Sequence, residues 1–110
     1  PNYSADELVK IASVMAEQLE YDIQPDAYPV FKAYIEKRMN LPFFSNARTV
    51  RNAMDRARMN SAIRVFERFA INGENGGVCS VNDLKSITAA DFQVLLDDIV
   101  NADASKRIFS

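Results

Sequence analysis

Residues 46–70 contain neither glycine nor proline, and this uninterrupted run restricts the chain to folds that accommodate one long helix. Its less polar side chains recur three or four positions apart, which brings them onto one face of a helix. We therefore predict a long amphipathic helix from Asn46 to about Ala70. The side chains expected on its buried seam are Val50, Met54, Ala57, Ser61, Val65, Phe66 and Phe69.

Two helices are predicted before this run. Ser4 and Glu7 have the spacing of a capping box, which opens a helix that ends near Glu20. A second helix starts at Pro25 or Asp26 and ends at Asn40-Leu41-Pro42, because proline cannot continue a helix. The apolar faces expected are Leu8, Ile11, Ala12, Met15 and Leu19 in the first helix, and Ala27, Val30, Phe31, Tyr34 and Ile35 in the second, with Phe43 and Phe44 filling the core at the bend that follows.

Two short helices are predicted after a glycine-containing loop at Asn72 to Cys79. The patterns Ser80-x-x-Asp83 and Thr88-x-x-Asp91 open them. No segment alternates apolar and polar residues for more than a few positions, so the fold class is an all-α bundle of four to five helices. The inward side chains of the last helix are expected to be Phe92, Leu95, Leu96, Ile99 and Val100.

The 110 residues have the size of one domain, so we assign residues 1–110 to a single unit. The chain begins with Pro1 rather than methionine, and we expect that it was cut from a longer protein.

The composition excludes several kinds of chemistry. The chain has no histidine and one cysteine, Cys79, which excludes histidine-based triads, imidazole metal sites and cysteine-cluster zinc sites. It has no phosphate-binding GxxxxGK[ST] loop, and the adjacent Asp97 and Asp98 point in different directions on a helix. We therefore expect no catalytic residue and no metal ligand within this chain.

The net charge of −2 disfavours a chain that binds nucleic acid or an anionic membrane with its whole surface. No stretch reaches the eighteen or more apolar residues of a membrane span. We expect neither nucleic acid nor membrane as a partner.

Residues 46–70 contain six arginines but only two acidic residues, Asp55 and Glu67. The four distal arginines are predicted to belong to a solvated face, on which helical spacing also places Arg51 beside Asp55. These four are Arg56, Arg58, Arg64 and Arg68.

Arg48 and Arg51 differ because they fall in the first turns of the helix, where the macrodipole disfavours a cation. Free backbone N–H groups at that end, together with a guanidinium, form a natural phosphate clamp. For Arg48 we favour anion binding over a structural salt bridge. Asn46 is expected to be the helix cap.

The segment from Pro42 to Arg58, PFFSNARTVRNAMDRAR, resembles the C-terminal lid subdomain of the CbxX/CfxQ family of AAA+ ATPases. In that family a phenylalanine, a short turn and N-A-R-x-V-R-N-x-x-D-x-A open the helix bearing the sensor-2 arginine. Pro1 to Leu8 is similar to the entry into the lid. Asp83-Leu84-x-x-Ile87 and Ala104-Ser105-x-Arg107-Ile108-Phe109 are similar to its closing segments.

This resemblance implies a helical bundle of the AAA+ lid type, in which Arg48 is the sensor-2 arginine and Asn46, Arg51, Asn52 and Asp55 are supporting motif residues. It implies ATP as the cofactor, with Mg²⁺ bound mainly by a core that this chain lacks. It further implies contacts with the core of the same polypeptide and of neighbouring subunits in a hexamer, and a client protein, which in red-type activases is Rubisco. The family occurs in bacterial cytoplasm and in the plastid stroma.

The main alternative is a helical protein-interaction module without nucleotide function, which docks through Phe43, Phe44 and the tail. A small DNA-binding module is disfavoured, because the chain is acidic overall and its arginine-rich helix carries many residues that the core needs.

Overall fold

The computed structural model describes residues 3–42 and 44–109, and of residues 103–109 it describes the backbone alone. Its helices are α1 (Ala5–Gln18), α2 (Ala27–Met39), α3 (Asn46–Val65), α4 (Val81–Leu84) and α5 (Ala89–Phe109). A π-helical segment, Phe66–Ile71, continues α3, and a 3₁₀ turn, Glu74–Gly77, follows it. Two short strands, β1 (Asp22–Ile23) and β2 (Ser86–Ile87), complete the chain.

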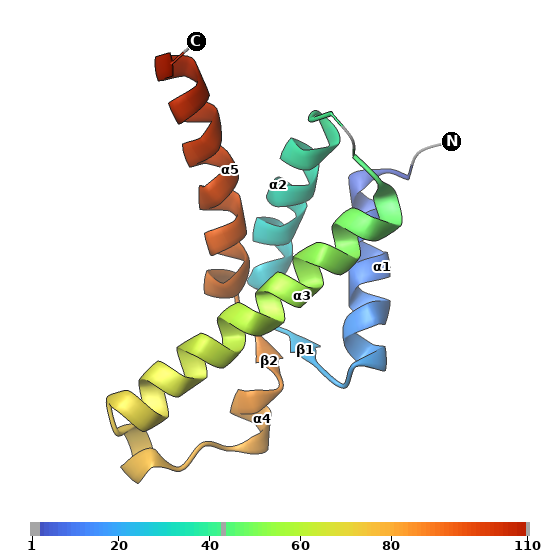
Figure 1. Cartoon of the computed structure of the whole chain (residues 1–110). Helices are drawn as coiled ribbons and strands as arrows, with labels where there is room; N and C mark the ends of the chain where they lie inside the picture. Colours follow the sequence, from blue (N-terminus) through green and yellow to red (C-terminus); the bar gives the residue numbers. More distant parts are fainter. Residues whose placement is uncertain (1–2, 43, 110) are drawn as a thin grey trace.

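Four helices enclose the core. Figure 1 shows α3 running diagonally across the bundle, and α2 packs against both α1 and α5. Phe31 of α2 and Phe92 of α5 are buried at the centre, with ring centroids 4.8 Å apart. The all-α prediction is confirmed. The largest apolar side chains buried with these two rings are Leu8, Ile35, Val50, Met54, Ile87 and Leu95.

The predicted starts of the helices are largely confirmed. The Ser4 hydroxyl accepts from the backbone N–H of Glu7, and the Glu7 carboxylate accepts from the backbone N–H of Ser4 at 2.9 Å, so the capping box is complete. Asp26 precedes α2 and Ser80 caps α4. At α5 the box is half formed, because the Asp91 carboxylate accepts from the N–H of Thr88 while the Thr88 hydroxyl has no partner among the described residues.

Several predictions about helix faces and lengths were wrong. Phe66 is 60% exposed, because it follows the buried Val65 directly and successive residues lie about 100° apart around a helix. Leu19 is 39% exposed, since α1 ends at Gln18 and the chain turns at Glu20, whose φ is +62°. The last helix is long, not short, and Val100 on it is exposed. Phe43 lies outside the described residues, whereas Phe44 packs against the core.

The sequence did not indicate the strands, because two residues are too few to show a period. Asp22 and Ile23 pair in parallel with Ser86 and Ile87. The backbone N–H of Asp22 donates to the carbonyl of Lys85 at 2.7 Å. This bridge places the buried Ile23 and Ile87 side by side under α3 and ties the two halves of the chain together.

Arg64 does not belong to the solvated face on which it was predicted. Its guanidinium donates to both carboxylate oxygens of Asp91, at 3.1 and 3.3 Å, and to the carbonyl of Ser86 at 3.2 Å. Asp91 is 2% exposed, and the Arg64 side chain is 22% exposed. Ser61 also donates to the carbonyl of Ser86, so this polar cluster joins α3, β2 and α5. The spacing of residues within one helix could not indicate a partner located in another.

The other distal arginines form more exposed ion pairs. Arg56 pairs with Asp98 of α5, Arg58 with Asp55 at 3.6 Å, and Arg68 with Glu74 at 2.7 Å. Their partly exposed side chains agree with a solvated face, except that Asp55 pairs with Arg58 and not with Arg51.

We predict that Asp91→Ala lowers the free energy of unfolding by about 3 kcal/mol, because it leaves the half-buried Arg64 guanidinium without its carboxylate. Asp98→Ala, which removes an exposed partner of Arg56, serves as the matched control and should cost less than about 1 kcal/mol. Urea unfolding of the two variants measures both values. Equal losses would contradict a special role for the buried pair.

We predict that the capping box of α1 weakens in acid. Hydrogen bonds from the backbone N–H and the hydroxyl of Ser4 hold the pKa of the Glu7 carboxyl below its ordinary value. The carboxylate therefore stabilises the folded chain fully above the unfolded-state pKa of about 4.3, and this contribution is lost as the pH falls through the lower folded-state pKa. The difference in unfolding free energy between wild type and Glu7→Ala should be smaller at pH 3 than at pH 7, and an equal difference at both would refute the prediction.

Candidate functional site

The first turn of α3 is fixed to the core on one side and open on the other. Thr49 and Val50 are buried, and the backbone N–H of Thr49 donates to the carbonyl of Ser45 at 2.8 Å. The N-cap is Ser45, so the prediction that Asn46 caps the helix was wrong: Asn46 is the first helical residue. Its side-chain oxygen is buried and has no hydrogen-bond partner among the described residues.

Arg48 lies exposed in this first turn. Its side chain makes no hydrogen bond or ion pair with any residue that the structure describes. The first turn of α3 has no acidic residue that would offset the helix macrodipole. A free guanidinium beside open backbone N–H groups therefore makes this end of α3 suitable for an anion.

Three of the motif residues occupy the outer face of α3. Arg48, Asn52 and Asp55 follow one another at spacings of four and three, and all three are exposed. This face is opposite the seam at Val50 and Met54, which is buried. Arg48 and Asn52 are therefore available to a partner, whereas their apolar neighbours hold the helix in place.

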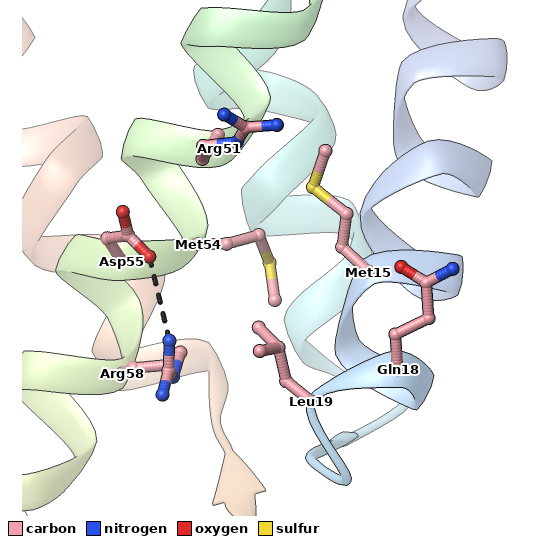
Figure 2. A pocket seen from close by; sticks show the side chains of 7 residues that line it. All are labelled: Met15, Gln18, Leu19, Arg51, Met54, Asp55 and Arg58. Atoms are coloured by element: carbon pink, nitrogen blue, oxygen red, sulfur yellow. Dashed lines mark ion pairs between the residues drawn. The ribbon is translucent and has the colours of Figure 1, made fainter.

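A groove between α1 and α3 brings two of the predicted residues together. Figure 2 shows Arg51 and Asp55 on the α3 side, with Met54 reaching between the helices. The groove has a volume of about 270 Å³. Arg48, Asn46 and Asn52 are not among its lining residues, which are Met15, Gln18, Leu19, Arg51, Met54, Asp55 and Arg58.

Arg58 is held at one end of this groove. Its guanidinium lies over the ring of Tyr21, 5.2 Å from the centroid, and Lys85 lies over the same ring at 5.5 Å. Asp55 is its carboxylate partner. Arg51, by contrast, forms no ion pair within the described part of the chain. Asp55 is thus committed to Arg58, and the charge of Arg51 stays available.

Sequence reasoning missed the α1 side of the groove and Arg58. The spacing of Arg51, Asp55 and Arg58, at i, i+4 and i+7, could have shown that these three share a face. Nothing in the spacing could have shown that the end of α1 lies against them.

The described residues contain no group of three or more histidine, cysteine, aspartate or glutamate side chains that could hold a metal ion. None of their helices has the length and apolarity that crossing a membrane requires. Cys79 is half-buried and its thiol donates to the carbonyl of Ser80.

Comparison with known proteins agrees with the motif. The sequence profile described as "AAA lid domain" matches residues 4–103. The chloroplastic cbbX homolog of Guillardia theta is 50% identical over 103 residues, which are 94% of this chain and 28% of that protein. The chloroplastic ribulose bisphosphate carboxylase/oxygenase activase of Cyanidioschyzon merolae is 51% identical over 92 residues, 84% of this chain and 30% of that protein.

A bacterial relative extends the similarity beyond plastids. The chromosomal protein CbxX of Cupriavidus necator is 40% identical over 91 residues, which are 83% of this chain and 27% of that protein. The chain thus spans less than a third of the length of these relatives.

Proposed function

Because the chain belongs to the AAA lid domain family and its relatives include CbxX/CfxQ proteins and a Rubisco activase, we propose that it is the C-terminal lid of an AAA+ remodelling ATPase. Residues 1–110 are then one lid subdomain, and the nucleotide-binding core lies elsewhere in the same polypeptide. On its own, the lid hydrolyses no ATP, since the groups that cleave the nucleotide belong to that core.

In this proposal Arg48 is the sensor-2 arginine that contacts the phosphates of ATP. The observation that supports it is an exposed guanidinium in the first turn of α3 without a partner in the described residues. A structural arginine would have an acidic neighbour, as Arg64 has in Asp91. The supporting residues are Asn46, Arg51, Asn52 and Asp55, which surround Arg48 on the first turns of the same helix. Mg²⁺ is bound mainly by the core.

The physical role of such a contact is to couple the lid to the state of the nucleotide. A ligand shifts a conformational equilibrium only by its difference in affinity for the two states. If Arg48 meets the terminal phosphate only when ATP is bound, hydrolysis removes that contact and releases the lid. α3 then transmits the change, because the Arg64–Asp91 pair joins its distal half to α5.

The partners in this proposal are the core of the same polypeptide, the neighbouring subunits of a hexamer and a client protein. Rubisco is the client that the name of one relative suggests. The names of two relatives place them in chloroplasts, and a third is bacterial, so the proposed compartment is the plastid stroma or the cytoplasm.

We predict that Arg48→Ala in the full-length protein lowers the ATPase rate or weakens ATP binding by about tenfold or more, the effect of losing one charge-assisted hydrogen bond. Arg56→Ala is the matched control, since Arg56 is another exposed arginine of α3 and its partner Asp98 lies away from the motif. Steady-state hydrolysis and nucleotide titration measure both quantities, and circular dichroism checks the helices. An unchanged enzyme would favour a helical interaction module without nucleotide function.

A further inference from the structure

The groove between α1 and α3 has an apolar floor. Met15 of α1 and Leu19, which follows its last turn, face Met54 of α3 across it (Figure 2). Met54 is fully buried, whereas Leu19 is 39% exposed and so leaves an aliphatic surface open to a partner. Methionine side chains adapt to ligands of different shape, because they are unbranched and polarizable. The floor therefore suits an apolar side chain.

The size of the groove limits what it can hold. Its volume of about 270 Å³ lies below the roughly 300–1,000 Å³ of typical small-molecule sites. This volume fits one or two amino-acid side chains better than a whole nucleotide. A polypeptide segment anchored by one apolar side chain fits this space.

The rim carries one uncompensated positive charge. Arg51 and Arg58 contribute two cations and Asp55 one anion, which pairs with Arg58 at 3.6 Å. The Arg51 guanidinium has no carboxylate partner among the described residues, and it lies at the edge of the apolar floor. Arginine binds carboxylates through two parallel hydrogen bonds, so a carboxylate is the complementary group.

The opposite wall offers a neutral polar group. Gln18 of α1 lines the groove, and its side chain is exposed. Its amide has both donors and an acceptor, which are the groups that a peptide backbone needs.

We propose that this groove is a docking site for a polypeptide segment that presents an apolar side chain next to an acidic one. The apolar side chain lies on Met15 and Leu19, above the buried Met54, and the carboxylate binds Arg51. This goes beyond the proposed nucleotide contact, because Arg48 is not part of the groove. It gives α3 a second ligand one turn away from Arg48, so that a docked segment acts on the same helix as the phosphate.

The four methionines of the chain provide the test, since Met15 and Met54 line the groove while Met39 and Met59 do not. The chain is labelled with ¹³C in its methionine methyl groups and titrated with a capped peptide of sequence Gly-Leu-Glu-Leu-Gly. We expect the signals of Met15 and Met54 to shift and those of Met39 and Met59 to stay. No shift at up to about 10 mM peptide would overturn the proposal.

Two comparisons test the role of the carboxylate. A Gly-Leu-Lys-Leu-Gly peptide and the variant Arg51→Gln should each bind about tenfold more weakly, the effect of removing one charge-assisted contact. The matched control Arg56→Gln should bind as wild type does, because Arg56 lies outside the groove.

Three results would each overturn the proposal: equal binding of the glutamate and lysine peptides, a shift of the 66% exposed Met59 in place of Met15 and Met54, or the same shifts with sodium phosphate alone. The last would show an anion site without apolar recognition. None of these measurements involves hydrolysis, so their outcome is independent of the role of Arg48.

Discussion

The ion pair between Arg64 and Asp91 determines how the two halves of the chain fit together. Asp91 accepts from the guanidinium of α3 and from the backbone N–H of Thr88, so one buried carboxylate both starts α5 and fixes it to α3. The carbonyl of Ser86 accepts from Ser61 and Arg64, which sets the position of β2. Since β2 pairs with β1, the connection between α1 and α2 is placed by the same cluster. Charges removed from water are stable only when their hydrogen bonds are satisfied. Few other placements of β2 and α5 relative to α3 would satisfy the buried charges of Arg64 and Asp91.

Much of the fold could be predicted from local patterns, and the errors have a common physical cause. The capping box at Ser4 and the end of α2 at Asn40 depend on neighbouring residues, and both are as expected. The burial of Arg64 and the exposure of Phe66 depend on which element covers each face of α3, and spacing along one helix does not specify this. The length of α5 was also missed, because the apolar pattern recognised in the sequence stops at Val100, whereas the helix continues to Phe109.

The candidate site, too, could be predicted only where it depends on residues close together in the sequence. The predicted start of the helix placed Arg48 in the first turn of α3, and helical spacing placed Arg51 and Asp55 on one exposed face, although the two do not pair. The groove that includes the latter two exists only because the end of α1 lies against α3. Arg58 was grouped with a solvated face, yet its contact with the Tyr21 ring and its pairing with Asp55 leave Arg51 available. Contacts between elements far apart in sequence thus decide which arginine can bind a partner.

The parallel bridge between β1 and β2 also affects the order in which the chain can fold. Ile23 and Ile87 belong to one core, as do Phe31 and Phe92. Contacts between residues this far apart form late, because the loop between them must close first. The ribosome synthesises the chain from its N-terminus. The helices α1, α2 and α3 are therefore complete before β2 and α5, which finish their core, have been synthesised. Until then the parts of α2 and α3 that α5 covers stay exposed, so the incomplete chain is open to aggregation until α5 has been synthesised.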